Sequence, residues 1–453
     1  MEKNFFKIIT PVFLLNIFKN NPEFRKITAN INWLFLDRFV QMGVAFFVGI
    51  WVVRYLGPEK YGMLSYAVAF VALFGFIAKL GMDEIIVREF VKNPEKKGDI
   101  FGTSVFLRLI AGFLAVAFSL VAVFFVKQGD FLVFGLTLII ALGFIFQVSD
   151  VIDFWFQSQV KSRYVVYVKN FVNIALGLIK ISLILLKAPL IFFALVILFE
   201  SIIILIGFIF IFLKNKKDTF NIKINLSLGK QILSDSWPLI LAGAAVSIYM
   251  KIDQVMIGSM LDNKSLGIYS AAVSLCEMWY FFPVIVTASV FPAIIYSKKI
   301  SRELFINRMQ MLYDFLTWVA IAIAVVATLF SKHIVGLLFG EAYIQSASVL
   351  AIYIWAGIFV SMGVASGKYW VVENLTKISL FVTFFGALIN VLLNLWFIPI
   401  FGIIGASVAT LVSYFISGMI FITLFKQARI VFKMQISALN IFRFFGYIRK
   451  IVN

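Results

Sequence analysis

The chain has 453 residues, of which 62% are hydrophobic and only 14% are charged, and its mean hydropathy is +1.01. A soluble globular chain averages about half apolar and about a quarter charged residues, so the composition excludes an ordinary soluble protein and indicates an integral membrane protein. A single cysteine excludes a disulfide framework or a cysteine-based metal site, and a single histidine excludes a multi-histidine metal centre.

The net charge of +18 points to the membrane surface rather than to nucleic acid. The sequence has no Gly-rich phosphate loop, no basic stripe interleaved with exposed aromatics and no soluble insert of domain size. We therefore assign the excess of Lys and Arg to cytoplasmic loops that face anionic lipid headgroups. No cofactor and no metal is predicted.

A spanning helix needs about 20 mostly apolar residues, and twelve stretches meet this criterion. The N-terminal segment MEKNFFKIITPVFLLNIFKNN precedes them and is interpreted as an uncleaved interfacial segment, because its apolar part is short and broken by Pro11. The expected spans are 31–53, 61–81, 100–126, 131–153, 164–186, 189–213, 237–261, 265–295, 311–331, 346–371, 377–398 and 403–425.

The distribution of Lys and Arg predicts the orientation of these spans. The N-terminus, every second loop and the tail together carry 29 of the 40 basic residues, and the alternate loops carry 6. Because positive residues concentrate on the cytoplasmic side, we expect a multi-pass protein of the cytoplasmic membrane with both termini in the cytoplasm. The tail FKQARIVFKMQISALNIFRFFGYIRK alternates basic and apolar residues, so we expect it to lie on the inner leaflet.

An internal repeat appears when the sequence is shifted by 205 residues, which aligns LGPEKYGMLSYAV (56–68) with LDNKSLGIYSAAV (261–273). Both segments link the first span of a half to its second span. The expected fold is therefore all-α, with two parallel six-helix lobes around a central cationic cavity, and the loops 57–62 and 262–267 should lie together on the outer face. The expected parts are an interfacial segment (1–28), an N-lobe (29–213), a basic linker (214–235), a C-lobe (236–426) and a basic amphipathic tail (427–453).

Two charges interrupt the seventh span, in the segment SIYMKIDQVMIG. A charge at the centre of a membrane helix costs about 3 kcal/mol on insertion scales and usually faces the bundle interior or a wet cavity. Helical spacing places Lys251 on one polar stripe with Ser247, Gln254 and Gly258, whereas Asp253 points roughly the opposite way. We expect Lys251 to face the cavity, and Asp253 either to line the cavity or to be a buried structural partner of a cation.

Other spans carry further candidates. The first span has Asp37 and Gln41 on one face with Arg38 adjacent, and the third has Arg108 within a stripe of small and polar residues. Arg38 and Arg108 lie about 10–12 Å from the cytoplasmic end, so snorkelling to the interface is the alternative to a cavity-facing role. The remaining charges are either snorkelling, packing or ion-binding groups: Lys79, Lys180, Glu200 and Glu277. Pro283 and Pro292 predict a kink in the eighth span.

Four stretches resemble the polysaccharide-biosynthesis flippases of the multidrug/oligosaccharidyl-lipid/polysaccharide exporter superfamily. These stretches are LGPEKYGMLSYA (56–67), DFWFQSQVKSRY (153–164), KIDQVMIG (251–258) and LINVLLNLWFIPIFGIIGASVATLVSY (388–414). The last is the most specific, and the resemblance extends over residues 28–425. One departure is Gln254, where many relatives are expected to carry a basic residue directly after the aspartate.

The resemblance implies a flippase that moves a polyprenyl-pyrophosphate-linked oligosaccharide across the membrane by alternating access, with Arg38, Arg108 and Lys251 as a cationic site for the pyrophosphate. Asp37, Gln41, Asp253 and Gln254 complete the expected substrate site, and Na⁺ or H⁺ is a possible coupling ion. The alternatives are a Na⁺- or H⁺-coupled drug or metabolite exporter of the same superfamily and a membrane-bound glycosyltransferase, polymerase or ligase. Short outward links and the absence of a carboxylate cluster in the sequence argue against an enzyme.

Overall fold

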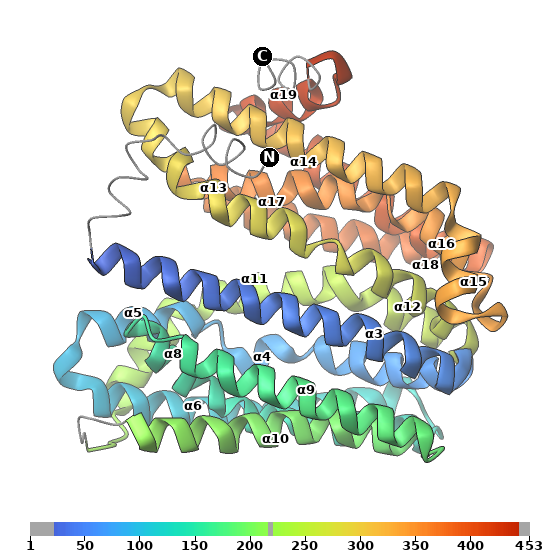
Figure 1. Cartoon of the computed structure of the whole chain (residues 1–453), viewed down its shortest axis with the longest axis horizontal. Coiled ribbons are helices and arrows are strands. Elements are labelled where there is room, and N and C mark those ends of the chain that lie inside the picture. Colours follow the sequence, from blue (N-terminus) through green and yellow to red (C-terminus); the bar gives the residue numbers. More distant parts are fainter. Residues whose placement is uncertain (1–21, 216–220, 444–453) are drawn as a thin grey trace. The chain divides into compact units, whose positions relative to one another are not determined.

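The structure, a computed structural model, describes the backbone of residues 22–215 and 221–443 and the side chains from residue 41 onward. All regular secondary structure within these ranges is helical (Figure 1), which confirms the all-α prediction. Contacts divide the chain after Gly267 into two compact units. The predicted interfacial segment 1–28 lies almost entirely outside the described residues.

The first unit contains nine helices and the beginning of a tenth. They are α3 (Pro22–Ala72), α4 (Gly75–Lys79), α5 (Asp83–Lys92), α6 (Lys97–Val126), α7 (Phe131–Phe146), α8 (Asp150–Ser158), α9 (Arg163–Leu185), α10 (Leu190–Asn215), α11 (Leu226–Met260) and the start of α12 (Asn263–Met278). Helices α6, α7, α10 and α9 pack successively side by side (Figure 1).

The second unit contains the rest of α12 and seven further helices. They are α13 (Phe281–Ile300), α14 (Arg302–Leu329), α15 (Ser331–Phe339), α16 (Ser346–Tyr353), α17 (Ala356–Val372), α18 (Thr376–Phe415) and α19 (Arg429–Ala438). Helix α14 packs against α13, α16, α17 and α19. The break between α12 and α13 comes shortly before Pro283, so the predicted kink in this span is confirmed.

Helix α18 is a hairpin of two helices rather than one long rod. A straight helix of its 40 residues would measure about 60 Å, twice the thickness of the hydrocarbon core. The backbone leaves the helical region at Gly402, where φ is 58°. Asn390 Nδ2 donates a hydrogen bond to Ser413 Oγ at 3.3 Å, although the two residues would be about 35 Å apart in a straight helix. The chain therefore reverses at Gly402.

Helix α3 breaks in the same way at Gly57, where φ is 69° and Pro58 follows. Side chains from both sides of this break, Val48 and Val52 before it and Leu64 and Ala67 after it, belong to one buried cluster. A left-handed glycine followed by proline ends the first helix, because proline has no N–H to continue the hydrogen-bond ladder.

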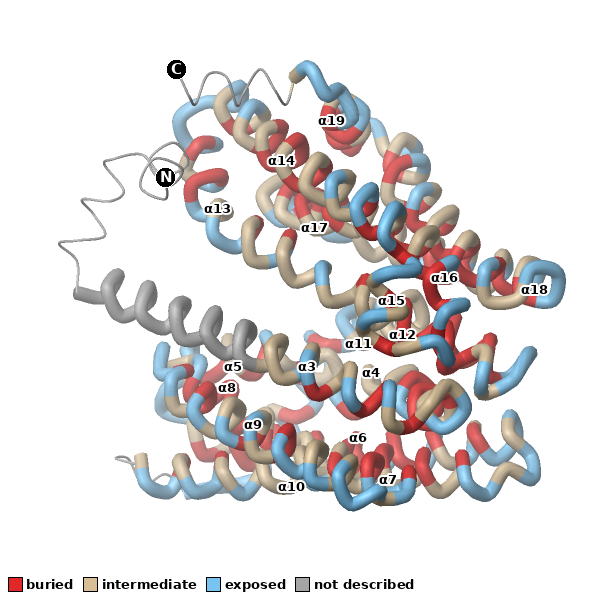
Figure 2. The backbone as a smooth tube through the Cα atoms, turned by 45° about the vertical axis from the view of Figure 1, so that its right-hand side comes forward, coloured by how far each residue is buried: buried red, intermediate tan, exposed pale blue. Residues whose placement is uncertain are grey.

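Long apolar helices are the basis of the membrane assignment. The described residues contain nine helical stretches long and apolar enough to cross a membrane, or ten if the bent pair 41–72 and 75–92 counts as one span. Buried and exposed positions alternate along helices such as α6 and α10 (Figure 2), as expected for helices with one face on protein and the other on lipid. The protein is a multi-pass membrane protein, and the count of twelve spans stays a prediction.

The two loops matched by the repeat contact each other within the first unit. A Cβ atom at Gly62 would overlap the carbonyl of Asn263, and a Cβ atom at Gly267 would overlap the carbonyl of Pro58. Gly62 and Gly267 are 205 residues apart, as are Pro58 and Asn263. The contact is therefore reciprocal, as a two-fold relation between repeats requires. The prediction that these loops lie together is confirmed.

Helix α11 packs against α4, α5 and α6 of the first unit. From the repeat we expected α11 to belong to the C-lobe, with the basic linker 214–235 as the boundary between the lobes. The contacts instead divide the chain after Gly267 and group α11 with the first unit. The physical reason is close backbone approach: a Cβ atom at Gly81 would lie 2.8 Å from the backbone nitrogen of Ile240 in α11. This arrangement connects the helix that carries Lys251 directly to the third span.

We predict that Gly62→Ala and Gly267→Ala each lower the thermal unfolding midpoint in detergent, because the added methyl group forces two backbones apart at a cost of about 1–3 kcal/mol. Gly49→Ala is the matched control in the same helix, since a Cβ there meets nothing within 4 Å and alanine favours the helix. Equal midpoints for Gly62→Ala and Gly49→Ala would contradict the reciprocal contact.

Candidate functional site

Lys251 lies in the second half of α11 and is partly exposed. Two residues beyond it the helix becomes buried, from Asp253 (6% exposed) and Gln254 (9%) to Gly258. The predicted polar stripe therefore changes character along its length: Ser247 and Lys251 are partly accessible, whereas Gln254 and Gly258 are enclosed by protein. Among the predicted site residues with described side chains, Lys251 is the accessible cation.

The C-terminal end of α11 is fixed by Tyr66 and Lys127. The Tyr66 hydroxyl and Ser259 Oγ form a hydrogen bond of 3.1 Å, and the buried Tyr66 ring lies against Gly258. Lys127 Nζ donates to the carbonyl of Gly258 and lies 4.9 Å from the centroid of the Tyr66 ring. A cation at this position stabilises the carbonyls of the last helical turn.

Lys127 follows α6 directly, in the short link to α7. Desolvation lowers the pKa of its ammonium group below the ordinary value, and the Asp130 carboxylate opposes this shift. Sequence reasoning missed Lys127 and Tyr66 as partners of the seventh span. The available signal was that Lys127 is the only basic residue in its loop.

Polar contacts also fix the N-terminal half of α11. Arg88 in α5 forms ion pairs with Asp235 in α11 and with its own neighbour Glu89, whose other oxygen accepts from Asn93 Nδ2 at 2.8 Å. At the start of α11, the Asn225 backbone N–H donates to Thr103 Oγ1 of α6 at 2.9 Å. These contacts leave α11 bound to α5 and α6 at one end and to α3 and α6 at the other.

Arg108 is buried among carboxylates instead of standing as a free cation. Its side chain is 1% exposed and pairs with Asp83 in the first turn of α5 and, at 3.4 Å, with Asp150 in the first turn of α8. It also donates to the carbonyl of Ala78 and lies 5.5 Å from the centroid of the Phe154 ring. The predicted stripe around Arg108 is thus a buried face of α6 with internal partners, and snorkelling of this side chain to the interface is not observed.

A second ion pair extends this network. Lys169 Nζ in α9 lies 2.7 Å from Asp153 Oδ2 in α8, and Gln157 Nε2 donates to the other Asp153 oxygen at 2.9 Å. Asp83, Asp153, Arg108 and Lys169 all lie close enough to Asp150 to act on its charge. We call these five residues the aspartate cluster. The sequence-based statement that no carboxylate cluster exists was wrong, because its members come from four helices.

The remaining predicted residues are placed as follows. Gln41 is partly exposed in α3. Asp37 and Arg38 belong to the same helix, but their side chains lie outside the described part of the chain. Lys180, Glu200 and Glu277 are partly exposed and Lys79 is exposed. The structure therefore brings Lys251 and Arg108 into one unit but gives them different surroundings.

The stretch with the most specific resemblance has a structural role in the second unit. Asn394 Nδ2 donates to Asn390 Oδ1 at 3.1 Å, and Asn390 in turn donates to Ser413 across the α18 hairpin. Both asparagines are fully buried. An interhelical hydrogen bond in hydrocarbon contributes about 0.6 kcal/mol on average, and here the Asn390–Ser413 bond joins the two helices while Asn394 orients Asn390 from within the same helix.

The tail helix α19 packs on protein, and the expectation that the tail lies on the inner leaflet stays a prediction. Val431, Gln435 and Ala438 are fully buried against the second unit. Gln310 Nε2 of α14 donates to the carbonyl of Met434 at 2.9 Å, and Arg443 Nε lies 3.4 Å from Asp314 Oδ2. The basic and apolar alternation reflected a helix with one face docked on α14.

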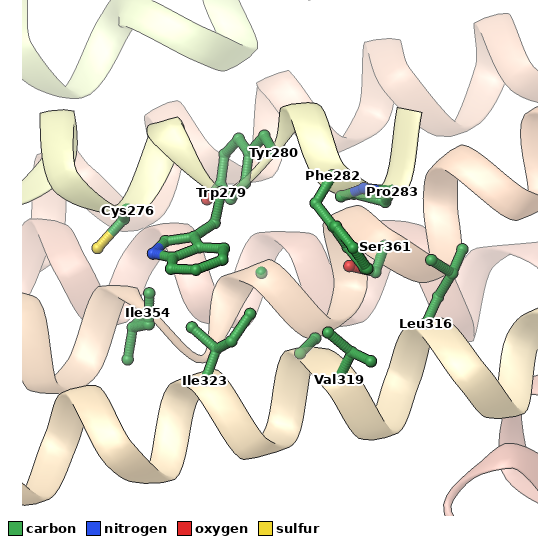
Figure 3. A pocket seen from close by; sticks show the side chains of 12 residues that line it. Cys276, Trp279, Tyr280, Phe282, Pro283, Leu316, Val319, Ile323, Ile354 and Ser361 are labelled. Atoms are coloured by element: carbon green, nitrogen blue, oxygen red, sulfur yellow. The ribbon is translucent and has the colours of Figure 1, made fainter. Parts of the chain in front are cut away.

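A small cavity of about 20 Å³ lies in the second unit beside the break between α12 and α13. Figure 3 shows Trp279 and Phe282 pointing into it, with Ile323 and Val319 of α14 on the opposite side. Its volume holds about one water molecule, so it is far too small for a glycan.

Comparison with known proteins agrees with the architecture. The sequence model of the family described as "Polysaccharide biosynthesis protein" matches residues 27–298, more than half of the chain. The chain belongs to this family. An uncharacterized membrane protein of Methanocaldococcus jannaschii is 22% identical over 420 residues, which cover 86% of this chain and 82% of that protein.

Solved transporter structures share the fold of this family member. An inward-facing multidrug resistance MATE family transporter of the MOP superfamily superposes with a TM-score of 0.69 at 17% identity, covering 88% of this chain and 96% of that one. The lipid II flippase MurJ in an inward closed conformation gives 0.66 at 15% identity, covering 91% of each chain. A MOP superfamily transporter from Pyrococcus furiosus gives 0.60 at 16%, with coverages of 88% and 95%. The fold is that of MOP superfamily transporters, as the resemblance implied.

We predict that Arg108→Met lowers the free energy of unfolding by about 3–5 kcal/mol, because it leaves the Asp83 and Asp150 carboxylates without their cation. The triple variant Arg108→Met/Asp83→Asn/Asp150→Asn should recover most of this loss, since no buried charge is then unpaired. Thermal unfolding in detergent measures both effects.

Asp235→Asn is the control, because Asp235 and its partner Arg88 are 39% and 40% exposed, Arg88 keeps its pair with Glu89, and such exposed pairs contribute at most about 1 kcal/mol. If Arg108→Met and Asp235→Asn unfold at the same temperature, the Arg108 pairs do not stabilise the first unit as described.

Proposed function

We propose that the protein is a flippase for polyprenyl-pyrophosphate-linked oligosaccharide in surface polysaccharide biosynthesis. Membership of the polysaccharide biosynthesis family and the MOP transporter fold support a transporter rather than an enzyme. The observation that carries the substrate assignment is Lys251, a partly accessible cation within a membrane-length helix. A lysine at membrane depth faces protein or water, not lipid, and a phosphate group is a ligand that suits its charge.

In this proposal Lys251 neutralises part of the pyrophosphate while the sugar crosses the membrane. Its compact ammonium group acts as a point charge with three rotatable donors, so it tolerates a phosphate that moves during transport. Arg38, Asp37 and Gln41 of the first span and Asp253 and Gln254 of α11 complete the proposed substrate site. Asp253 and Gln254 are buried, which suits residues that support the helix next to the cation.

Arg108 belongs to the proposed phosphate site only if it exchanges partners. In this structure its guanidinium is engaged by Asp83 and Asp150, so a phosphate would have to displace a carboxylate from it. Lys251 is partly exposed, whereas Arg108 is sealed. We therefore assign the first contact with pyrophosphate to Lys251.

Membrane position and partners follow from the charge distribution. The excess of Lys and Arg in alternate loops supports a cytoplasmic-membrane location with both termini in the cytoplasm, facing anionic lipids. In this proposal the substrate enters from that side.

A coupled drug or metabolite exporter of the same superfamily is the second candidate. The aspartate cluster favours it, because intramembrane carboxylates are typical of ion-driven transporters. A lipid-linked substrate accounts better for Lys251, since a cationic drug would be repelled by it.

We predict that Lys251→Arg retains transport of lipid-linked oligosaccharide into the outer leaflet of proteoliposomes, whereas Lys251→Gln loses most of it, on the order of tenfold or more, with unchanged membrane insertion. One lost charge–phosphate hydrogen bond of about 1.5–3 kcal/mol corresponds to this factor. Lys180→Gln is the matched control in another span and should transport normally. Normal transport by Lys251→Gln would exclude a role for its charge in substrate binding.

A further inference from the structure

The aspartate cluster carries an unbalanced charge. Asp83, Asp150 and Asp153 supply three negative charges, whereas Arg108 and Lys169 supply two positive charges. The charged groups that act on Asp150 from the neighbouring helices are these four partners, from α5, α6, α8 and α9. With all five groups ionised, one negative charge is left over.

An unbalanced charge is costly at this position. Arg108 is 1% exposed and lies within the expected third span, about 12 Å from its cytoplasmic end at 1.5 Å per residue. A partly desolvated carboxylate that lacks a full cationic partner is unfavourable beside such a buried group, and a group that can change its protonation state does so instead.

Asp150 is the carboxylate with the weakest compensation. Asp83 makes the closer contact with Arg108, and Asp153 is held by Lys169 at 2.7 Å and by Gln157 at 2.9 Å. Asp150 has only the 3.4 Å contact with Arg108 Nη1. A proton added to the cluster is therefore best accommodated on Asp150.

Buried polar atoms beside Arg108 leave the cluster able to form a second set of hydrogen bonds. Among the described residues, Arg108 Nε and the hydroxyl of Ser104 have no hydrogen-bond partner, and Ser104 is fully buried one turn before Arg108 on the same helical face. Asp83 and Asp150 remain 44% and 34% exposed at their side chains, so protons reach the cluster although Arg108 is sealed.

We propose that the aspartate cluster is a single-proton site at Asp150 and that the proton is the ion coupled to transport. Protonation converts the Asp150 carboxylate to a neutral carboxylic acid and weakens its attraction to Arg108, leaving Asp83 as the anionic partner of the guanidinium. This loosens α8 from α6. Helix α6 and its neighbours α4 and α5 support α11, so the change reaches the helix of Lys251 through direct contacts. The claim that the proton is coupled to transport, which we call the coupling half, rests on the proposed function. The claim that Asp150 binds a proton does not.

The test of the proton site needs no substrate. Infrared difference spectra of the purified full-length protein in nanodiscs, recorded during a pH titration in KCl, detect the carbonyl stretch of a protonated carboxylic acid. The wild type should show one such group in the pH range of the transport assay. Asp150→Asn should abolish the signal. Asp83→Asn should abolish it as well, because two carboxylates then face two cations.

Asp235→Asn is the matched control, because Asp235 is an ion-paired aspartate outside the cluster, and it should keep the signal. A wild type without the band, or an Asp150→Asn protein with the wild-type band, would overturn the proposal. Loss of the wild-type band when NaCl replaces KCl would also overturn it, by showing that the site takes a sodium ion.

The coupling is measured separately in proteoliposomes. An imposed pH gradient should stimulate oligosaccharide-lipid translocation by the wild type and by Asp235→Asn, and the stimulation should be lost in Asp150→Asn. If the infrared band behaves as expected but no oligosaccharide-lipid is moved by any variant, the proposed function fails while the proton site stands. If translocation occurs but ignores the pH gradient, the coupling half is wrong.

Discussion

The cost of an uncompensated charge in hydrocarbon is the constraint on which the polar interior of this protein depends. The charge of Arg108 is compensated by the two aspartates between which it is buried. The charge of Lys127, at the end of α6, is compensated by a helix carbonyl to which it donates. Lys251 differs because it keeps access to solvent within α11. Within the described part of the chain, Arg108 and Lys127 are thus compensated inside the protein, whereas Lys251 is a mid-helix cation that stays partly exposed.

Close packing through small residues connects α11, the helix of Lys251, to the rest of the first unit. Membrane helices gain little from the hydrophobic effect and associate through close backbone contact and hydrogen bonds. Gly81 approaches α11 from the link before α5, and Gly258 within α11 accommodates the Tyr66 ring. The reciprocal contact of Gly62 and Gly267 adds the two repeat-related turns to the same unit. Helix α11, which carries Lys251, is therefore in direct contact with α5 and α6, which carry Asp83 and Arg108.

The sequence alone predicted the fold and part of the candidate site. Hydropathy and the 205-residue repeat predicted the helices and the pairing of the loops at Gly62 and Gly267, because both signals are local in sequence. The surroundings of Arg108 were not predictable, since Asp83, Asp150 and Lys169 come from three other helices and a periodicity argument sees only neighbours on one helix. The docking of the tail helix was not predictable for a similar reason: its apolar stripe indicates a buried face, but whether lipid or α14 covers that face depends on tertiary contacts such as that of Gln310 with Met434.

Lipid-linked intermediates in cells that lack this protein test the flippase proposal most directly. Mass analysis of polyprenyl-linked glycans, combined with an impermeant label for the outer leaflet, reports both the completeness of the repeat unit and its side of the membrane. A flippase predicts that complete polyprenyl-pyrophosphate-linked units accumulate on the cytoplasmic leaflet and return to the outer leaflet when the wild-type protein is restored, but not when the Lys251→Gln variant is. Accumulation of an unfinished glycan, or complete units already in the outer leaflet, would contradict the proposal.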